Sequence, residues 1–557
     1  MRRILIPLSI LLLACQTIAQ FQQVATATFS DTPSVPKRVV SPTPTVPLPT
    51  PLPLNEPKES APVTVRIHPD DGLYVGDLVS FEVAAPTGFE NGEIEIHLDP
   101  PNGPVFGPQP FESFGLSSEL QASFYWVWDT SDLEAGDYVL AFQVLGDGPA
   151  WEQTVSLFPE DALPKYALDA EWESASSQCC IIYYLTSTSS ERDLQAVLTQ
   201  VDEQAAHVAE TMGSEFSHSP TIVLVPRVIG HGGFTTEEIY VSYLDRNYAG
   251  GSFSQVLHHE LVHILDRELG GNFRPTMLVE GFAVYLSGGH FKPEPLFLRA
   301  ATLLELDWYI PISSLVDDFY SHQHEIGYLE SGALIEFMVD KWGQEPFEDF
   351  YRDIRPTSTG SHAAAMNMAL QEHFDVSLAD LDAQFLLTLQ ALPVVPEMSA
   401  DVQNTVTYYD TVRRYQNILD TSAHFRTAWF IDIDDLLDLD IAADYLRHPN
   451  SPENMALEAM FVTAYTHLIS REHLESERIL TVINAVLEQI DVGHLLPFNA
   501  HPLAGEYLSI VNMLLENGYS PQEIHIIGKS ARVLAVSSGL ELVELYLQSM
   551  ENIWSLD

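Results

Sequence analysis

The residues of this chain best suited to chemistry are two histidines four positions apart with a glutamate beside the first: His259, Glu260 and His263. They form the pattern H-E-x-x-H inside residues 253–269, which we predict to be helical. Residues four apart share one face of a helix, so both imidazoles can bind one metal ion. Glu260, beside a ligand, can accept a proton from metal-bound water. The motif therefore predicts zinc-dependent hydrolysis of an amide bond.

A third ligand must come from elsewhere, because a catalytic zinc ion usually has three protein ligands and an open fourth position. A metzincin would continue as H-x-x-G-x-x-H, but Asp266 and Leu269 occupy the Gly and His positions, which excludes that class. Glu280 lies 17 residues after His263, at the start of a second apolar segment that we predict to be a helix. The turn GGNFRP at 270–275 lets the two helices pack antiparallel, which can bring Glu280 over the histidines.

Two segments together resemble the gluzincin metallopeptidases, in particular the bacterial peptidase MA-like domains: HHELVHILDRELGG and RPTMLVEGFAVYLSGG. The resemblance covers about residues 178–392, and the second segment carries the family's E-G-x-A-x-Y pattern. It implies that His259, His263 and Glu280 bind Zn²⁺ and that Glu260 is the catalytic base. It also implies a sheet above the active-site helix whose edge strand holds an extended peptide, for which IYVSYL at 239–244 is our candidate.

The same resemblance implies a Tyr or His that stabilises the tetrahedral oxyanion. Tyr328 and His231 are the candidates, although a tyrosine at a helix start often serves packing instead. Thermolysin-like enzymes carry an Asp four residues after the ligand Glu, but Val284 holds that position here. Asp266 is left with two open interpretations: it orients a zinc-binding histidine, or it forms a salt bridge with Arg267 or Arg274.

We assign no catalytic role to the other nearby histidines or to the cysteine pair. His258 and His290 match no position of the family pattern, so we predict that neither binds the metal. Cys179 and Cys180 are neighbours, and neighbouring cysteines rarely bond to each other. A metal-binding pair is an alternative, but the apolar flank IIYYL favours two small buried residues of a strand.

Charge and length limit the classes of protein that this chain can belong to. The 78 acidic and 25 basic residues give a formal net charge of −53. Such a surface repels nucleic acid and anionic membranes, so we exclude both as partners of the folded surface. With 557 residues, the chain is too long for a single core and indicates roughly three or four domains. The sequence indicates no oligomeric state.

The first residues have the layout of a secretory signal, which we place at 1–19. Arg2 and Arg3 precede an apolar run that is too short to span a bilayer. The residues LLAC, which end at Cys15, resemble a bacterial lipobox; ordinary cleavage after Ala19 is the alternative. No later segment is long and apolar enough for a transmembrane helix. We therefore expect a protein secreted across the cytoplasmic membrane of a bacterium, with the mature chain a surface lipoprotein that contacts the membrane through its lipid.

The remaining chain divides into four stretches of different composition. Residues 20–62 form a Pro- and Thr-rich linker that favours extended polyproline II. Residues 63–160 alternate apolar and polar positions between turn residues, which resembles an immunoglobulin-like β-sandwich. Residues 165–392 mix strands and helices and include the zincin-like (gluzincin) region, and residues 398–557 are predominantly helical. The predicted fold class is a multidomain chain: an all-β sandwich, an α+β zincin-like domain and an all-α domain.

Three functions compete on this reading of the sequence. The first is a zinc metallopeptidase that cleaves a peptide or protein substrate at the cell surface, with an endopeptidase slightly favoured over an aminopeptidase because nothing marks an amino-terminal anchoring site. The second is a catalytically inactive surface binding or adhesion protein on a zincin scaffold. The third is a structural zinc site. The intact set of three ligands plus Glu260 favours the first, since structural zinc sites are usually closed four-ligand sets rich in Cys.

Overall fold

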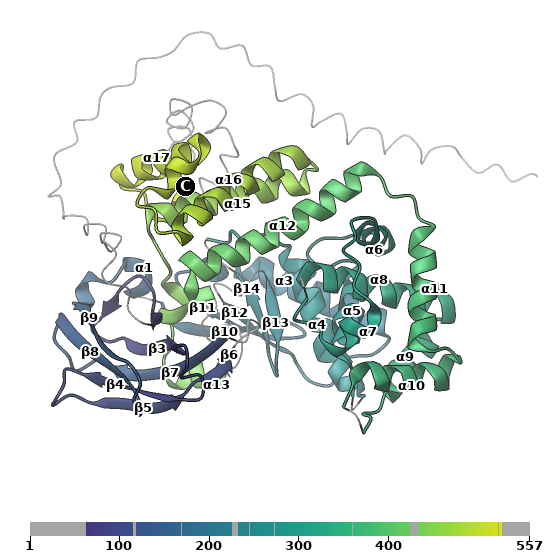
Figure 1. Cartoon of the computed structure of the whole chain (residues 1–557), viewed down its shortest axis with the longest axis horizontal. Coiled ribbons are helices and arrows are strands. Elements are labelled where there is room, and N and C mark those ends of the chain that lie inside the picture. The colour runs from purple at the N-terminus through teal and green to yellow at the C-terminus, as the bar shows by residue number, and fades with distance from the viewer. Residues whose placement is uncertain are drawn as a thin grey trace, which may run out of the picture. The chain divides into compact units, whose positions relative to one another are not determined.

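The structure of the chain is a computed structural model. It describes residues 63–114, 119–168, 170–225, 232–243, 246–271, 273–322, 324–358, 360–423, 433–521 and 523–525. The predicted signal segment with Cys15 and the predicted linker lie outside these residues. Strands dominate the N-terminal region of the described chain and helices its C-terminal part (Figure 1). None of the described helices is long and apolar enough to cross a membrane. The domain boundaries drawn from the sequence stay predictions.

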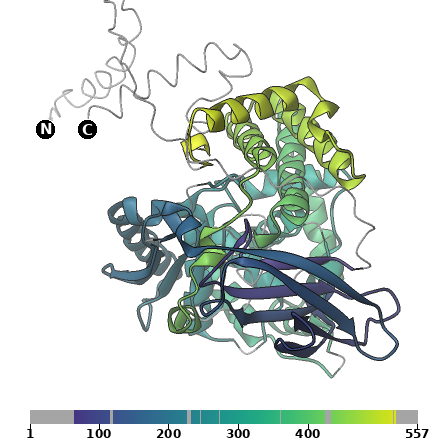
Figure 2. The same ribbon diagram turned by 90° about the vertical axis from the view of Figure 1, so that its left-hand side faces the viewer.

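The N-terminal region consists of two sheets. Its strands are β1 Val65–His68, β2 Leu73–Tyr74, β3 Leu78–Ala84, β4 Glu93–Leu98, β5 Val105–Pro110, β6 Glu112–Phe114, β7 Glu119–Asp129, β8 Gly136–Val144 and β9 Ala150–Phe158. One sheet has the order β1-β3-β7-β6 and the other β2-β9-β8-β4-β5 (Figure 2, purple to blue). Alternate side chains point inward, so Phe81 and Phe124 of the first sheet share a core with Ile96 and Phe142 of the second.

A mixed five-stranded sheet follows. Its strands are β10 Trp172–Ser176, β11 Ile181–Leu185, β12 Thr221–Val225, β13 Gly233–Thr235 and β14 Ile239–Ser242. Their order is β10-β11-β12-β14-β13, in which β11, β12 and β14 run parallel and the two outer strands run antiparallel to their neighbours. The parallel strands are apolar on both faces, as parallel strands with two covered faces usually are.

Each face of this mixed sheet has its own cover. On one face, α3 (Leu194–Met212) and α4 (Phe253–Leu269) pack against Ile222 and Val241. On the other face, Val223 and Tyr240 pack against α13 (Ile433–Asp438) and Tyr445. The sheet therefore supports the H-E-x-x-H helix from one side, and a C-terminal segment of the chain covers its other side.

The second site helix, α5 (Thr276–Ser287), follows α4 after a tight turn. Gly270 and Gly271 have φ values of 92° and 108°, which a side chain would strain, and the turn they make returns the chain across α4. Gly281 lies where α5 crosses α8 (His324–Trp342). A Cβ atom at Gly281 would lie 2.8 Å from the Ser331 carbonyl oxygen. The glycine beside Glu280 therefore permits the close packing of α5 on α8.

Helices make up most of the remaining described chain. The longer ones are α6 Leu296–Glu305, α7 Ile312–Asp317, α9 Gln344–Asp353, α10 His362–Phe374, α11 Leu378–Gln390, α12 Pro396–Leu419, α15 Pro452–Ile469, α16 His473–Asp491 and α17 Pro502–Glu516. The short ones are α1 Lys165–Leu168, α2 Ser189–Arg192, α14 Ala443–Leu446, η1 Glu160–Ala162, η2 Thr421–Ala423 and η4 Pro497–Ala500. Helix α12 contacts α6 and α8 on one side and α15 and α16 on another, so it joins the site region to the C-terminal helices (Figure 1).

The C-terminal helices also hold the segment that leads from β14 into α4. Arg246 is 1% exposed, and its guanidinium pairs with Glu458 at 2.6 Å. The Tyr248 hydroxyl donates to Asp420 Oδ2 at 2.5 Å. Gly250 lies so close to Tyr465 that a Cβ atom would meet its ring at 2.6 Å. These contacts fix the point at which the chain enters the H-E-x-x-H helix.

Cys179 and Cys180 form a disulfide, which corrects the prediction of two unlinked buried residues in a strand. Strand β11 begins at Ile181, so the pair lies in the turn that follows β10. Neighbouring side chains of a strand point to opposite faces, whereas those of a turn can point the same way. Cys180 is buried in the core beneath the mixed sheet, and Cys179 is half-buried.

Candidate metal centre

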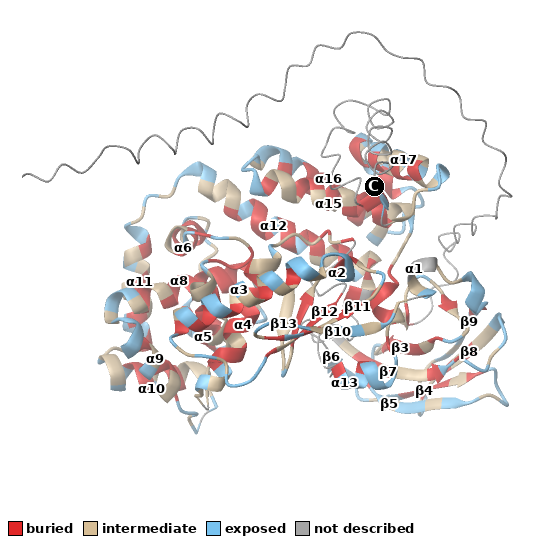
Figure 3. Ribbon diagram, turned by 180° about the vertical axis from the view of Figure 1, so that it is seen from behind, coloured by how far each residue is buried: buried red, intermediate tan, exposed pale blue. Residues whose placement is uncertain are grey.

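The two histidines of H-E-x-x-H face each other within one helix. Helix α4 is buried along most of its length (Figure 3), and His259 and His263 are one helical turn apart on the face that meets α5. Their Nε2 atoms are 3.0 Å apart. Among the described residues, the Nδ1 atom of neither ring has a hydrogen-bond partner. Both rings therefore point their Nε2 atoms toward a common point. Packing around the helix holds them there, since no hydrogen bond to Nδ1 does so among the described residues.

Glu280 reaches the same point from the second turn of α5. Its Oε2 lies 3.3 Å from His259 Nε2 and 3.2 Å from His263 Nε2. Among the described residues these three are the group that could hold a metal ion, with ligand atoms within 4.8 Å of one another. Atoms about 2.0–2.1 Å from a tetrahedral zinc ion lie roughly 3.4 Å from one another. The observed triangle therefore fits one face of a zinc tetrahedron.

The charges of the three side chains are strongly coupled. Burial alone would lower the pKa of His263, but the carboxylates of Glu280 and Glu260 raise it to about 9. Burial would raise the pKa of Glu280, but the imidazoles of His263 and His259 hold it well below its ordinary value. Glu280 is thus a buried carboxylate paired with an imidazolium, and a metal ion at this point would have to replace the proton that holds them together.

Glu260 lies beside the ligands and beneath the sheet edge. It is 5% exposed, and burial raises the pKa of its carboxyl, partly offset by His259 and His263. Thr235 of β13 donates its hydroxyl proton to Glu260 Oε2 at 2.8 Å. A Cβ atom at Gly233 would lie 3.1 Å from Glu260 Cγ, so glycine lets β13 pass this close to the helix. The carboxyl is held at the junction of α4 and β13.

The candidate substrate edge needs a correction. Residues 239–244 were expected to form the edge strand, but β14 lies between β12 and β13 and is paired on both sides. The edge next to Glu260 is β13, which pairs antiparallel with β14. The sequence hid this strand, because its Gly-rich GFT segment lacks the apolar alternation that marks a strand. Among the described strands, the outer one at this side of the sheet is therefore β13.

Tyr320, which no sequence motif indicates, contacts one of the three candidate ligands. The Tyr320 hydroxyl donates to Glu280 Oε1 at 3.0 Å. Tyr320 lies in the loop between α7 and α8, and no local pattern distinguishes it from other loop tyrosines. Tyr328, the oxyanion candidate from the sequence, is more deeply buried than Tyr320. It is 7% exposed, and its ring centroid is 6.1 Å from that of His259. Its catalytic role stays a prediction. His231, the other oxyanion candidate, lies outside the described residues.

Asp266 makes its direct polar contacts with two arginines and a tyrosine. It is 2% exposed and forms ion pairs with Arg274 and with Arg352, whose Nη2 atom lies 3.2 Å from Asp266 Oδ1. The Tyr351 hydroxyl donates to Asp266 Oδ2 at 2.8 Å. These contacts match the salt-bridge interpretation of Asp266. Of the two arginines expected from the sequence, Arg274 is its partner and Arg267 is not.

The neighbouring histidines stand apart from the ligand triangle. His258 Nδ1 donates a hydrogen bond to Gln204 Oε1 of α3 at 3.0 Å. His290 lies near His259, at 6.0 Å between ring centroids, but its Nδ1 is hydrogen-bonded to Glu325 Oε2 at 2.8 Å. Neither belongs to the group of possible ligands.

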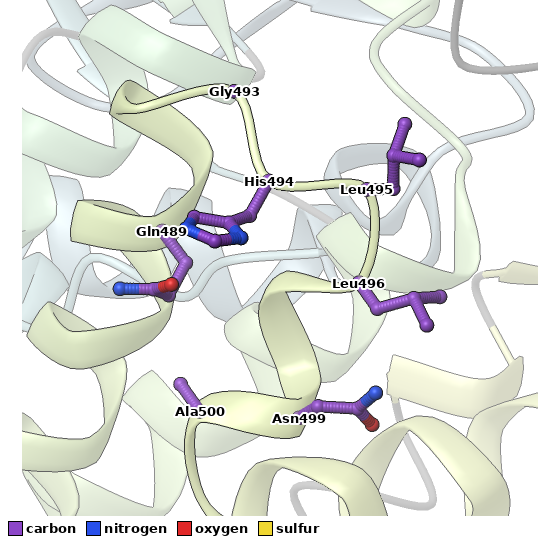
Figure 4. Close-up of a pocket in the computed structure, with 7 residues that line it drawn as sticks. All are labelled: Gln489, Gly493, His494, Leu495, Leu496, Asn499 and Ala500. Atoms are coloured by element: carbon purple, nitrogen blue, oxygen red, sulfur yellow. The ribbon is translucent and has the colours of Figure 1, made fainter.

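A surface hollow at the end of α16 has no part in the centre. Figure 4 shows it, lined by Gln489, Gly493, His494, Leu495, Leu496, Asn499 and Ala500. None of these residues contacts the ligand triangle in the described structure, and the hollow holds no pair of carboxylates or histidines.

Comparisons with known proteins add little to this geometry. No protein-family model matches the sequence, and no curated protein matches it. Among solved structures, the chain is similar to an aminopeptidase N family protein from Idiomarina loihiensis, with 11% sequence identity and a TM-score of 0.27, over 61% of this chain and 78% of that chain. A TM-score of this size carries no argument about fold or activity, so any function must be argued from the site itself.

Proposed function

We propose that this chain is a zinc metallopeptidase of the gluzincin class that hydrolyses peptide bonds outside the cell. The observation that carries the proposal is the triangle of His259, His263 and Glu280, with edges of 3.0, 3.2 and 3.3 Å and the carboxyl of Glu260 beside it. Two imidazoles and one carboxylate leave the fourth zinc position open, as in catalytic zinc sites.

Each residue then has a chemical role. Bound zinc would supply a Lewis acid that polarises the peptide carbonyl and acidifies a water molecule. Glu260 accepts the proton of that water and returns it to the leaving amine, and its raised pKa suits both transfers. The Tyr320 hydroxyl lies beside the ligand set, where it would stabilise the developing oxyanion by exchanging its hydrogen bond to Glu280 Oε1 for one to that oxyanion. Tyr320 takes this role in the proposal in place of Tyr328.

The substrate would bind as an extended peptide along β13. Among the described residues this strand pairs with β14 alone, and Thr235 within it contacts Glu260, so main-chain hydrogen bonds along its other edge would align the scissile bond with the base. Such pairing does not depend on a free amino terminus, which supports an endopeptidase. The N-terminal sandwich, which we propose to be immunoglobulin-like, would act as a spacer above a lipid-anchored linker.

An inactive binding protein on the same scaffold is the competing proposal. The close contact of Thr235 with Glu260 argues against it, because a scaffold without catalysis has no use for a buried carboxyl at this position. A structural zinc site is disfavoured by the three-ligand set.

One experiment separates these functions. The purified mature protein is loaded with zinc, its metal content is measured, and cleavage of a peptide library is compared with that of Glu260→Gln. We expect one zinc ion per chain in both proteins and a kcat at least about 100-fold lower in the variant. Blocking the amino termini of the peptides distinguishes an endopeptidase, which still cleaves them, from an aminopeptidase. Zinc retained without cleavage by the wild type would support the binding protein instead.

A further inference from the structure

The proposed base is hydrogen-bonded to the strand that is proposed to hold the substrate. The hydroxyl of Thr235, the last residue of β13, donates to Glu260 Oε2 at 2.8 Å. The same hydroxyl lies 3.3 Å from the main-chain carbonyl oxygen of Glu260. Glu260 is 5% exposed and Thr235 is half-buried, so protein surrounds most of this bond. One hydroxyl of β13 therefore contacts both the main chain and the carboxyl of the base.

Two contacts from β13 restrain different parts of the Glu260 side chain. A Cβ atom at Gly233 would lie 3.1 Å from Glu260 Cγ, so the strand packs against the stem of this side chain. Side chains of a strand point alternately to its two faces, so positions 233 and 235 face α4 together. Packing on the stem leaves the last torsion angle of a glutamate broad, because that bond joins an sp³ to an sp² carbon. The hydrogen bond from Thr235 restricts that rotation, since it acts on one carboxylate oxygen.

The strand that presents Thr235 is itself held on both sides of that residue. Phe234, the preceding residue, stacks on Tyr240 of β14 with ring centroids 4.8 Å apart and planes 4° apart. Tyr240 is 2% exposed, so this stacking ties the strand to the sheet core. Arg267 of α4 donates from Nη1 to the carbonyl oxygen of Thr236, the following residue. Thr235 therefore presents its hydroxyl from a supported position, as a residue that orients a reactive group must.

The bond is compatible with the proton transfers assigned to Glu260. Each of the two oxygens of a carboxylate accepts hydrogen bonds, and Thr235 occupies Oε2. Oε1 is left to take the proton of the attacking water. After that transfer Oε2 is the carbonyl oxygen of a carboxylic acid, which still accepts the bond from the hydroxyl. The proton of Thr235 thus stays on Thr235 in every step, and it can orient the base before and after the base is protonated.

We infer that Thr235 is a positioning residue, which sets the orientation of the Glu260 carboxyl and keeps the base aligned with the strand proposed to receive the peptide. This inference rests on the proposed function, in which Glu260 is the base. A general base must lie within hydrogen-bond reach of the proton that it abstracts, and a displacement of about 1 Å can lower a rate by about 100-fold. A carboxyl that turned about its last bond would lose that reach.

The kinetic test removes the Thr235 hydroxyl or keeps it, in the zinc-loaded protein with a peptide that the wild type cleaves. We expect Thr235→Val, which has nearly the same shape, to lower kcat by about 10- to 100-fold, with KM and zinc content within about twofold of wild type. Thr235→Ala removes the hydroxyl without adding bulk and should show the same loss. Thr235→Ser keeps the hydroxyl, so its kcat should stay within about threefold of wild type. The matched control is Thr221→Val, the same substitution in β12 of the same sheet, which should change neither constant.

Two kinetic results would overturn the inference. Wild-type kcat in Thr235→Val and Thr235→Ala would show that the base needs no support from this hydroxyl. A loss in Thr235→Ser as large as that in Thr235→Val would assign the effect to the packing of the side chain and not to its hydrogen bond.

A second measurement does not depend on activity. Crystal structures of the metal-free wild type, Thr235→Ser and Thr235→Val are compared at Glu260. We expect one orientation of the carboxyl, bonded to position 235, in the first two proteins. In Thr235→Val we expect the carboxyl to turn away from position 235 or to occupy more than one orientation. An unchanged carboxyl in this variant would refute the positioning role, whereas absence of cleavage by the wild type would refute the proposed function and leave the crystal structures to decide on Thr235.

Discussion

At the scale of single residues, Glu280 contacts both histidines and Tyr320, so it determines both the charge and the geometry of the candidate centre. It lies 3.3 Å from His259 Nε2 and 3.2 Å from His263 Nε2 and accepts the Tyr320 hydroxyl with its other oxygen. One carboxylate oxygen thus faces the histidines while the second holds the phenol. Replacing Glu280 with glutamine, a neutral amide of nearly the same shape, removes the charge and keeps the volume of the side chain.

We therefore predict that Glu280→Gln weakens zinc binding by more than about 100-fold, since even partners outside the ligand set typically contribute 10–100-fold. The charge of Glu280 is also what raises the pKa of His263 to about 9 against the pull of burial, so in the metal-free variant this pKa should fall. Competition with a chelator measures the first effect and imidazole NMR titration the second. Glu268→Gln, which changes a carboxyl of the same helix α4 outside the ligand triangle, is the control. Wild-type zinc affinity in Glu280→Gln would remove it from the ligand set.

The predictability of these residues follows from their distance along the chain. His259 and His263 share a helix, so the helical repeat alone predicts that they face one metal ion. To predict Glu280 as the third ligand, one further step is needed, the antiparallel packing of two helices across a glycine turn. Tyr320 could not be predicted in this way, because a loop residue reaches the centre through the packing of Phe319, which local sequence does not record. Tyr328 is a candidate because the resemblance implies a Tyr or His from the helical part, and that criterion does not distinguish a buried phenol from one beside the ligand residues.

At the scale of elements, strand order was the least predictable property of the site region. The apolar run of β14 indicated a strand, but its neighbours in the sheet are set by pairing between segments distant in sequence. The edge strand β13 contains Gly233, which a strand pattern disfavours, and that glycine is there because Val256 and Glu260 leave no room for a side chain. The feature that hides β13 in the sequence is therefore the one that brings it to the base.

Helix packing gives a sharper prediction, because two helical glycines differ in their surroundings. A Cβ atom at Gly281 would meet the Ser331 carbonyl oxygen at 2.8 Å, whereas one at Gly505 of α17 would meet the Phe498 carbonyl oxygen at 3.8 Å. We expect Gly281→Ala to reduce the free energy of unfolding by about 1–3 kcal/mol through overpacking and to weaken zinc binding by displacing Glu280. Gly505→Ala should instead raise it by about 0.5–1 kcal/mol, since alanine favours a helix. Urea unfolding of both variants measures the change in the free energy of unfolding. A change of the same sign in both variants would contradict the packing described for α5 and α8.

At the scale of the whole described chain, the C-terminal segment after α12 is tied to each earlier region. Arg246 and Tyr248, which precede the H-E-x-x-H helix, are bonded to Glu458 and Asp420. Trp172 of the mixed sheet donates to the Ile441 carbonyl oxygen at 2.8 Å. Arg447 forms an ion pair with Asp77 of the N-terminal sheets, and both are buried. The helical C-terminal region therefore contributes to the position of the candidate metal centre and is not an independent appendage.

Asp444, in the same C-terminal segment, offers a test of these ties through pH. It is 6% exposed and accepts the Trp126 indole proton at 2.8 Å, and burial raises the pKa of its carboxyl from 3.8 to about 6 despite that bond. The folded protein thus binds this proton more tightly than the unfolded chain does, so stability falls as pH rises from about 4 to about 6 and stays lower above that window.

Asp444→Asn removes this dependence, because an amide oxygen still accepts the bond from Trp126 but carries no charge. At pH 7.5 we expect the variant to be more stable than the wild type by up to about 3 kcal/mol, the free energy that corresponds to the difference between the two pKa values. At pH 4, where the folded wild type is protonated, the two proteins should unfold at nearly the same urea concentration. Asp435→Asn, an exposed carboxyl of α13, serves as the control and should change neither midpoint. A variant that is equally stabilised at both pH values would show that burial of the Asp444 charge is not the cause.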